Sequence, residues 1–153
     1  MNNEADACII LKNSIIKSQG FCWKIPDPAN MFNKTSQRPF DHFGVFQNKP
    51  LYAETKYLST LKSFDLQRIE DHQINNLCDI KESIPYAHCW IVLAISIMRG
   101  ENRFYIFDNP FLIRDRRLQK ENFLKRELDI LPYLCVHKGV IDLTNYKGDT
   151  NDL

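Results

Sequence analysis

The chain has 153 residues, which fits one domain of ordinary size. Its composition, 44% apolar and 25% charged, is typical of a globular protein and excludes a disordered chain. The net charge of +1 predicts no class of partner by itself, and the longest apolar run, Cys89 to Met98, is too short to span a membrane.

Five cysteines stand far apart, at positions 8, 22, 78, 89 and 135. They form no Cys-x-x-Cys pair, and their odd number and wide spacing argue against a disulfide framework and against a zinc site. We therefore expect reduced, largely buried cysteines. Residues 1–6 carry two acidic side chains and no basic one, which is unlike a secretory signal peptide. These features predict a cytoplasmic protein that has no membrane partner.

The first segments are predicted to be a helix and a strand. Residues 3–19 carry apolar side chains at helical spacing, and Gly20 can end that helix. Residues 21–25 are aromatic and apolar, as in a strand, and Pro26 and Pro28 then end regular structure. A polar loop follows.

A pair of strands is predicted next, over residues 40–47 and 51–58, joined by a turn at Asn48-Lys49-Pro50. Side chains alternate between the two faces of a strand, so Glu54 and Lys56 are expected on the same face of the second strand.

The second half of the chain alternates helices and strands. The predicted elements are a helix over 67–82, a buried central strand over 87–98, a strand over 103–107 that Asn109-Pro110 breaks, and a helix over 121–129. Trp23 and Trp90 are expected in the core. The order of elements predicts an α/β fold with a central β-sheet flanked by helices, as one domain over residues 1–153 whose tail from about residue 147 lies outside regular structure.

Asp41 on the first strand of the predicted hairpin can approach Glu54 and Lys56 on the second. Two carboxylates that converge beside an ammonium suit metal-assisted cleavage of a phosphodiester, because hard oxygen ligands hold Mg²⁺ and the cations offset charge on the phosphate. Glu-x-Lys on a strand is a common pattern, so a charged, solvated hairpin face is the alternative interpretation.

Other catalytic patterns are missing from the sequence. There is no Gly-x-Ser-x-Gly motif, no glycine-rich phosphate loop and no convincing Cys-His pair. The histidines at 42, 72, 88 and 137 are scattered. Residues 99–126 hold eight Lys or Arg against four Asp or Glu. Such a basic segment could contact phosphates, although it is more often solvated surface.

A longer stretch, FDHFGVFQNKPLYAETKYLSTLKSFDLQRIEDHQINNL at residues 40–77, resembles the core of the RecU family of Holliday junction resolvases, which are PD-(D/E)xK nucleases. The motifs that match, in order, are Asp41, Gly44-Val45-Phe46, Glu54-Thr55-Lys56 and Asp71-His72-Gln73-Ile74. Upstream, Lys24 to Pro28 resembles the Lys-x-Pro-x-Pro element of the family.

The resemblance implies a restriction-endonuclease-like core with a mixed sheet and a Mg²⁺ cofactor, with Mn²⁺ able to replace it. Asp41 and Glu54 would be metal ligands, and Gln73 would complete the metal shell or its water network. Lys56 would stabilise the transition state, and Glu4 would be the acidic residue that related nucleases carry on their first helix.

The activity implied by the resemblance is Mg²⁺-dependent, structure-selective cleavage of branched DNA, with paired nicks that resolve four-way junctions. Symmetric cutting implies a homodimer. The candidates for backbone phosphate contacts are Lys34, Arg38, Lys62, Arg114, Arg116 and Arg117.

Two departures from the family pattern keep other functions open. Only residues 29–40 are available for the long stalk that the family carries, and Pro39 stands where relatives tend to have a threonine. A nuclease acting on duplex, flap or single-stranded DNA is therefore the first alternative, and a catalytically silent DNA-binding module is the second. The small size and short stalk would suit a phage-encoded protein acting in the host cytoplasm.

Overall fold

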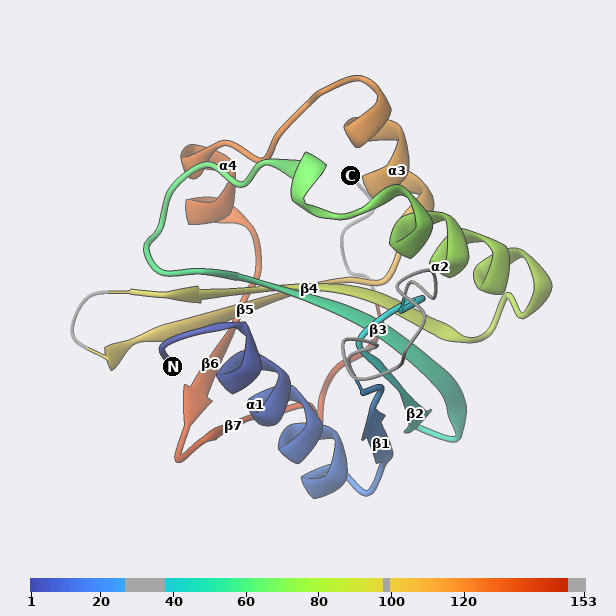
Figure 1. Cartoon of the computed structure of the whole chain (residues 1–153). Coiled ribbons are helices and arrows are strands. Elements are labelled where there is room, and N and C mark those ends of the chain that lie inside the picture. Colours follow the sequence, from blue (N-terminus) through green and yellow to red (C-terminus); the bar gives the residue numbers. More distant parts are fainter. Residues whose placement is uncertain (27–37, 98–99, 149–153) are drawn as a thin grey trace.

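The computed structural model describes residues 1–26, 38–97 and 100–148. In these residues, seven strands form one mixed sheet in chain order from β1 to β7, and helices lie on both of its faces (Figure 1). The predicted fold class, α/β with a mixed sheet flanked by helices, is confirmed. Most of the predicted loop after Pro28, and most of the predicted tail, fall outside the described residues. None of the helices described here has the length and apolar character of a membrane span.

The helices are α1 (Glu4–Lys17), α2 (Asp71–Ser83), α3 (Pro110–Leu118) and α4 (Lys125–Ile130), with a short 3-10 helix, η2 (Leu66–Arg68). The strands are β1 (Phe21–Lys24), β2 (His42–Phe46), β3 (Lys49–Leu58), β4 (His88–Ser96), β5 (Asn102–Phe107), β6 (Leu134–His137) and β7 (Val140–Ile141).

Strands β3 and β4 form the centre of the sheet. They are parallel and are joined by the crossover through α2, whereas every other neighbouring pair is antiparallel. All residues of β4 except the last are buried. The unbroken apolar run in the sequence predicted this burial, which is typical of a strand covered on both faces.

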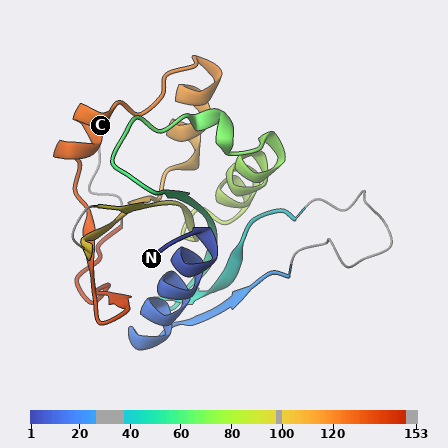
Figure 2. The same cartoon turned by 60° about the vertical axis from the view of Figure 1, so that its left-hand side comes forward.

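The sheet separates two hydrophobic cores. One lies between the sheet and α2, α3 and α4, and the other lies between the sheet and α1. Helix α1 contacts β1, β3 and β7, so both edges of the curled sheet approach it (Figure 2). Along β3, Leu51 and Ala53 belong to the core under α1, whereas Tyr52 and Leu58 pack on the α2 side.

The hairpin between β2 and β3 is tighter than predicted. Its turn consists of Gln47 and Asn48, both with positive φ angles of 50° and 60°, which is the backbone of a two-residue hairpin turn. The expected turn at 48–50 is therefore wrong, because Pro50 already lies in β3, opposite Val45. On the other side of β2, a Cβ atom at Gly44 would lie 1.9 Å from the carbonyl oxygen of Phe21, so this strand position requires glycine.

Helix α2 begins later than predicted. Residues 66–68 form η2, and the α-helix starts at Asp71, where Gln73 Oε1 accepts a hydrogen bond of 3.1 Å from the Glu70 backbone N–H.

The sequence pattern did not predict helix α3 or strands β6 and β7. Pro110 ends β5 as predicted, but it also occupies the first turn of α3, where its missing N–H costs nothing. Asn109 Oδ1 caps the same helix by accepting from the Leu112 N–H at 3.2 Å. Strands β6 and β7 have only four and two residues, too short for a clear alternating pattern.

Candidate active site

Asp41 directly precedes β2, and its buried carboxylate is held in place across the hairpin. Asp41 Oδ2 accepts a hydrogen bond of 2.8 Å from the backbone N–H of Thr55, the residue between Glu54 and Lys56. The Asp41 N–H also donates to the Ala53 carbonyl at 3.0 Å. The tight hairpin turn sets this register, so the sequence predicted the approach of Asp41 to Glu54-Thr55-Lys56 correctly.

Glu54 and Lys56 point to the same side of β3, as their spacing predicts. Lys56 Nζ lies 2.7 Å from Glu54 Oε1. The Glu54 carboxylate is fully buried, and its Oε2 has no hydrogen-bond partner among the residues that the structure describes. A buried, orphaned carboxylate oxygen is costly unless a cation or a donor satisfies it.

The electrostatics of this site favour an additional cation. Burial and, to a smaller extent, the charge of Asp41 raise the pKa of Glu54 to about 7, and Lys56 and Arg38 offset these two effects only in part. Even with these two cations nearby, the ionised form of the buried Glu54 carboxylate is not fully compensated. The oxygens of Asp41 and Glu54 are the kind of ligand that Mg²⁺ takes, and a divalent ion would favour the ionised form of Glu54.

Glu4 lies in the electrostatic field of the same site. It is the first residue of α1 and is half-buried, and burial raises its pKa. Lys56 lowers the pKa of Glu4 and Asp41 raises it again, so the start of α1 is close to both groups. Among the described residues, no hydrogen bond or ion pair joins Glu4 to Asp41, Glu54 or Lys56, so its role in the site stays a prediction.

Gln73 is buried in the first turn of α2, where its side-chain oxygen caps its own helix. In the described part of the chain, no hydrogen bond joins it to Asp41 or Glu54. The neighbouring His72 does tie α2 to the site, because its Nε2 lies 2.8 Å from the carbonyl oxygen of Arg38. The role of Gln73 in the metal shell therefore stays a prediction.

The predicted phosphate-binding residues have different surroundings. Arg38 Nη2 lies 2.5 Å from Asp41 Oδ1, which places a second cation directly on the acidic site. Lys62 is exposed, and the guanidinium of Arg114 is on α3 above an aromatic ring. Lys34 lies outside the described residues. Arg38 is therefore the predicted phosphate-binding residue that contacts the acidic site directly.

Arg116 and Arg117 form ion pairs with other residues of the chain. The Arg116 guanidinium lies 3.0 Å from Glu127 Oε1 on α4, and Arg117 pairs with Asp71 at the start of α2. Each contact joins two helices, so both side chains have a structural use that the sequence did not indicate. To contact DNA phosphates, Arg116 and Arg117 would have to break these ion pairs.

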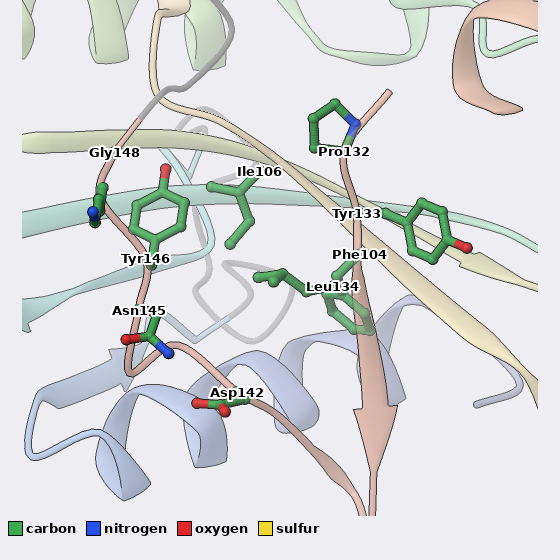
Figure 3. A pocket seen from close by; sticks show the side chains of 10 residues that line it. Phe104, Ile106, Pro132, Tyr133, Leu134, Asp142, Asn145, Tyr146 and Gly148 are labelled. Atoms are coloured by element: carbon green, nitrogen blue, oxygen red, sulfur yellow. The ribbon is translucent and has the colours of Figure 1, made fainter. Parts of the chain in front are cut away.

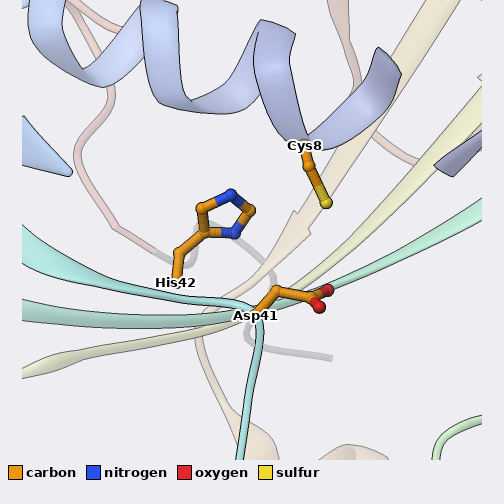
Figure 4. A group of neighbouring side chains, drawn as sticks. All are labelled: Cys8, Asp41 and His42. Carbon is orange, nitrogen blue, oxygen red and sulfur yellow. The ribbon is translucent and has the colours of Figure 1, made fainter. Parts of the chain in front are cut away.

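A second cluster shares Asp41 with this site. Cys8 on α1, Asp41 and His42 each offer a ligand atom, and these atoms all lie within 4.8 Å of one another (Figure 4). The sequence shows no Cys-His pattern, yet the fold brings Cys8 and His42 close together. The two residues are distant in the sequence, and only the packing of α1 against the sheet brings them together, so no local pattern could have revealed the cluster.

An apolar pocket with a volume of about 430 Å³ contains no residue of the Asp41-Glu54-Lys56 site or of the Cys8-Asp41-His42 cluster (Figure 3). It is formed by β5, β6 and the segment after β7, and its lining includes Phe104, Tyr133 and Tyr146. None of the residues predicted for catalysis or metal binding lines it.

Comparison with known proteins gives a weak structural likeness. No protein-family model matches the sequence, and no match is found among curated proteins. Among solved structures, the chain is similar to Hjc, a Holliday junction resolvase from the archaeal hyperthermophile Archaeoglobus fulgidus, with 15% sequence identity and a TM-score of 0.37. The match covers 60% of this chain and 67% of Hjc. A likeness at this level supports no inference about the activity of this chain.

Proposed function

We propose that this chain is a Mg²⁺-dependent endonuclease that cuts DNA at a site formed by Asp41, Glu54 and Lys56. The observation that carries the proposal is the fully buried Glu54, with one oxygen orphaned and the other 2.7 Å from Lys56, beside a second buried carboxylate. A merely solvated hairpin face, the alternative interpretation, would not bury these three side chains together.

The roles of the side chains follow from their positions. Asp41 and Glu54 would hold Mg²⁺, which when bound polarises the phosphate and the attacking water. The ammonium of Lys56 would stabilise negative charge that develops on the phosphate. Arg38 pairs with Asp41 Oδ1, so a metal ion bound at that oxygen would compete with this ion pair, and Arg38 is our candidate for contact with a backbone phosphate.

We propose a four-way junction as the substrate and paired nicks as the reaction, on the basis of the resemblance across residues 40–77. Such an enzyme would act in recombination and DNA repair in the cytoplasm. The short segment available for a stalk favours one alternative, a nuclease of the same type that acts on duplex, flap or single-stranded DNA.

Cleavage of a labelled four-way junction, beside linear duplex, flap and single strand, tests this proposal. With Mg²⁺ or Mn²⁺ we expect symmetric nicks confined to the junction, and with EDTA we expect none, because the carboxylate pair requires a divalent ion. Equal rates on all four substrates would retain the nuclease and contradict the junction specificity. Binding of the junction without any cleavage would favour the silent DNA-binding module.

An exposed apolar patch on β1 and β2 supports a homodimer. It consists of two cross-strand pairs, Phe21 with Val45 and Trp23 with Phe43. The side chain of Trp23 is 58% exposed. The expectation that Trp23 lies in the core is wrong, because the helices on that side of the sheet pack against β3 and β4 and leave β1 and β2 uncovered. Contiguous exposed aromatic residues are typical of protein interfaces.

Disruption of this patch is expected to separate the dimer. In sedimentation velocity, the parent should sediment as a dimer and the Trp23→Lys, Phe43→Lys double variant as a monomer, because two buried ammonium groups would lack partners. Ile130→Lys is the matched control, since Ile130 is 83% exposed on α4 and lies outside the patch. A monomeric parent, or a double variant that remains dimeric, would contradict this interface.

A further inference from the structure

Beneath α1, a thiol, a carboxylate and an imidazole meet inside the protein. Cys8, Asp41 and His42 are 2%, 1% and 0% exposed, and one ligand atom of each lies within 4.8 Å of the others. Figure 4 shows the Cys8 sulfur directed from α1 towards the chain segment that carries Asp41 and His42. The three groups therefore face one small space between the helix and the sheet.

The imidazole of His42 has no interaction that accounts for its burial. Neither Nδ1 nor Nε2 has a hydrogen-bond partner among the described residues. A buried polar group without a partner is destabilising, so a ligand that satisfies the imidazole would explain its burial. A free, neutral imidazole nitrogen is also the form that binds transition metals.

Strand geometry explains why these groups lie on the α1 side. His42 shares a face of β2 with Phe46, which belongs to the core under α1, and Cys8 lies on the buried face of that helix beside Ala7. Thr55 lies on the opposite side of β3 from Glu54 and Lys56, so its side chain also faces the α1 side, where it hydrogen-bonds with the Cys8 thiol.

We propose that Cys8, Asp41 and His42 form a second metal site, for a transition-metal ion of the Zn²⁺ class, which shares Asp41 with the proposed Mg²⁺ site. Sulfur, nitrogen and oxygen ligands suit Zn²⁺ and Co²⁺, whereas Mg²⁺ avoids thiolates and prefers oxygen. Bonds of roughly 2.0–2.3 Å would bring the three atoms to about 3.5 Å apart, a small contraction of the present cluster. The fourth position would remain for water.

Sharing of Asp41 has a functional consequence that rests on the proposed nuclease activity. A carboxylate that binds a transition metal on the α1 side is less able to hold Mg²⁺ next to Glu54. Occupation of the second site would therefore inhibit cleavage. Binding also requires the thiolate of Cys8, so metal uptake should release a proton.

Titration of the full chain with Co²⁺ alone tests the site without reference to activity. We expect a thiolate-to-cobalt charge-transfer band in the near ultraviolet and visible bands of a four-coordinate ion, both lost in Cys8→Ser. Cys89→Ser is the matched control, because Cys89 is equally buried but lies in the core on the other side of the sheet. In His42→Ala the visible bands should weaken and shift, which keeps the test valid if Cys8→Ser does not fold.

The outcomes distinguish this site from the proposed nuclease. If the parent gives no charge-transfer band, or if Cys8→Ser and His42→Ala keep the parent spectrum, the second site is wrong whatever the chain does to DNA. If the bands appear and depend on Cys8, the site stands even where no DNA is cut. In a chain that does cut, Zn²⁺ should inhibit the Mg²⁺-dependent reaction in the parent and in Cys89→Ser. Cys8→Ser should be resistant.

Discussion

Asp41→Asn is expected to lower the rate of Mg²⁺-dependent DNA cleavage by about a thousandfold while the chain stays folded. A metal that stabilises transition-state charge contributes several kcal/mol, and about 4 kcal/mol corresponds to three orders of magnitude in rate. Asparagine keeps an oxygen that can accept the Thr55 N–H, so the hairpin contact at 2.8 Å can persist. The substitution therefore removes the charge and the ion pair with Arg38, and leaves the hairpin contact with Thr55.

Single-turnover cleavage of the labelled junction, at several Mg²⁺ concentrations, measures this effect. Asp79→Asn is the matched control, because Asp79 is exposed on α2 and should retain the parent rate. Circular dichroism and thermal unfolding show whether Asp41→Asn is folded. A folded variant that cuts at the parent rate, with the parent dependence on Mg²⁺, would remove Asp41 from the proposed site.

The predicted acidic site depends on short-range geometry, which the sequence encodes directly. Alternation along a strand places Glu54 and Lys56 together, and a two-residue turn brings Asp41 opposite them. Even a turn predicted one residue too late did not change which side chains meet. Local rules of strand geometry were sufficient because all three residues belong to one hairpin and its immediate flank.

The second cluster depends on long-range packing, which no local pattern encodes. Cys8 reaches His42 only because α1 lies on the concave side of the sheet, where its apolar face fills the core. A buried cysteine on a helix and a buried histidine on a strand each have an ordinary structural explanation when considered alone. The contacts of Arg116 and Arg117 were unpredictable for the same reason, since both depend on how the helices pack.

Asp41 belongs to both groups of ligands, because it directly precedes β2 and its carboxylate is bonded to the neighbouring strand β3. Its carboxylate is bonded to the backbone of β3, with Glu54 on the α2 side and His42 on the α1 side. A single aspartate therefore faces a hard-ligand site and a soft-ligand site. The two proposed sites would make the choice of metal ion, in addition to access of DNA, a means of controlling the proposed activity.

Glu54→Gln is expected to stabilise the metal-free chain at pH 8 and to abolish Mg²⁺-dependent cleavage. Burial raises the pKa of Glu54 from an ordinary value of 4.5 to about 7, so the folded state holds its proton more tightly than the unfolded state does. The stability that this proton gives is fully present below pH 4.5 and is lost as the pH rises to about 7. Above pH 7 the ionised carboxylate costs roughly 3 kcal/mol, a cost that neutral glutamine avoids.

Urea unfolding of the parent and Glu54→Gln, at pH 8 and pH 5 without metal, measures the difference in unfolding free energy. We expect a gain of roughly 2–3 kcal/mol at pH 8 that largely disappears at pH 5, where the parent carboxylate is protonated when folded. Glu82→Gln, at an exposed position of α2, should show no gain at either pH. Mg²⁺ at pH 8 should stabilise the parent more than Glu54→Gln, because binding to the folded state requires the charged ligand. A variant less stable than the parent at pH 8 would mean that Lys56 already compensates the buried carboxylate, and the need for a bound cation at this site would disappear.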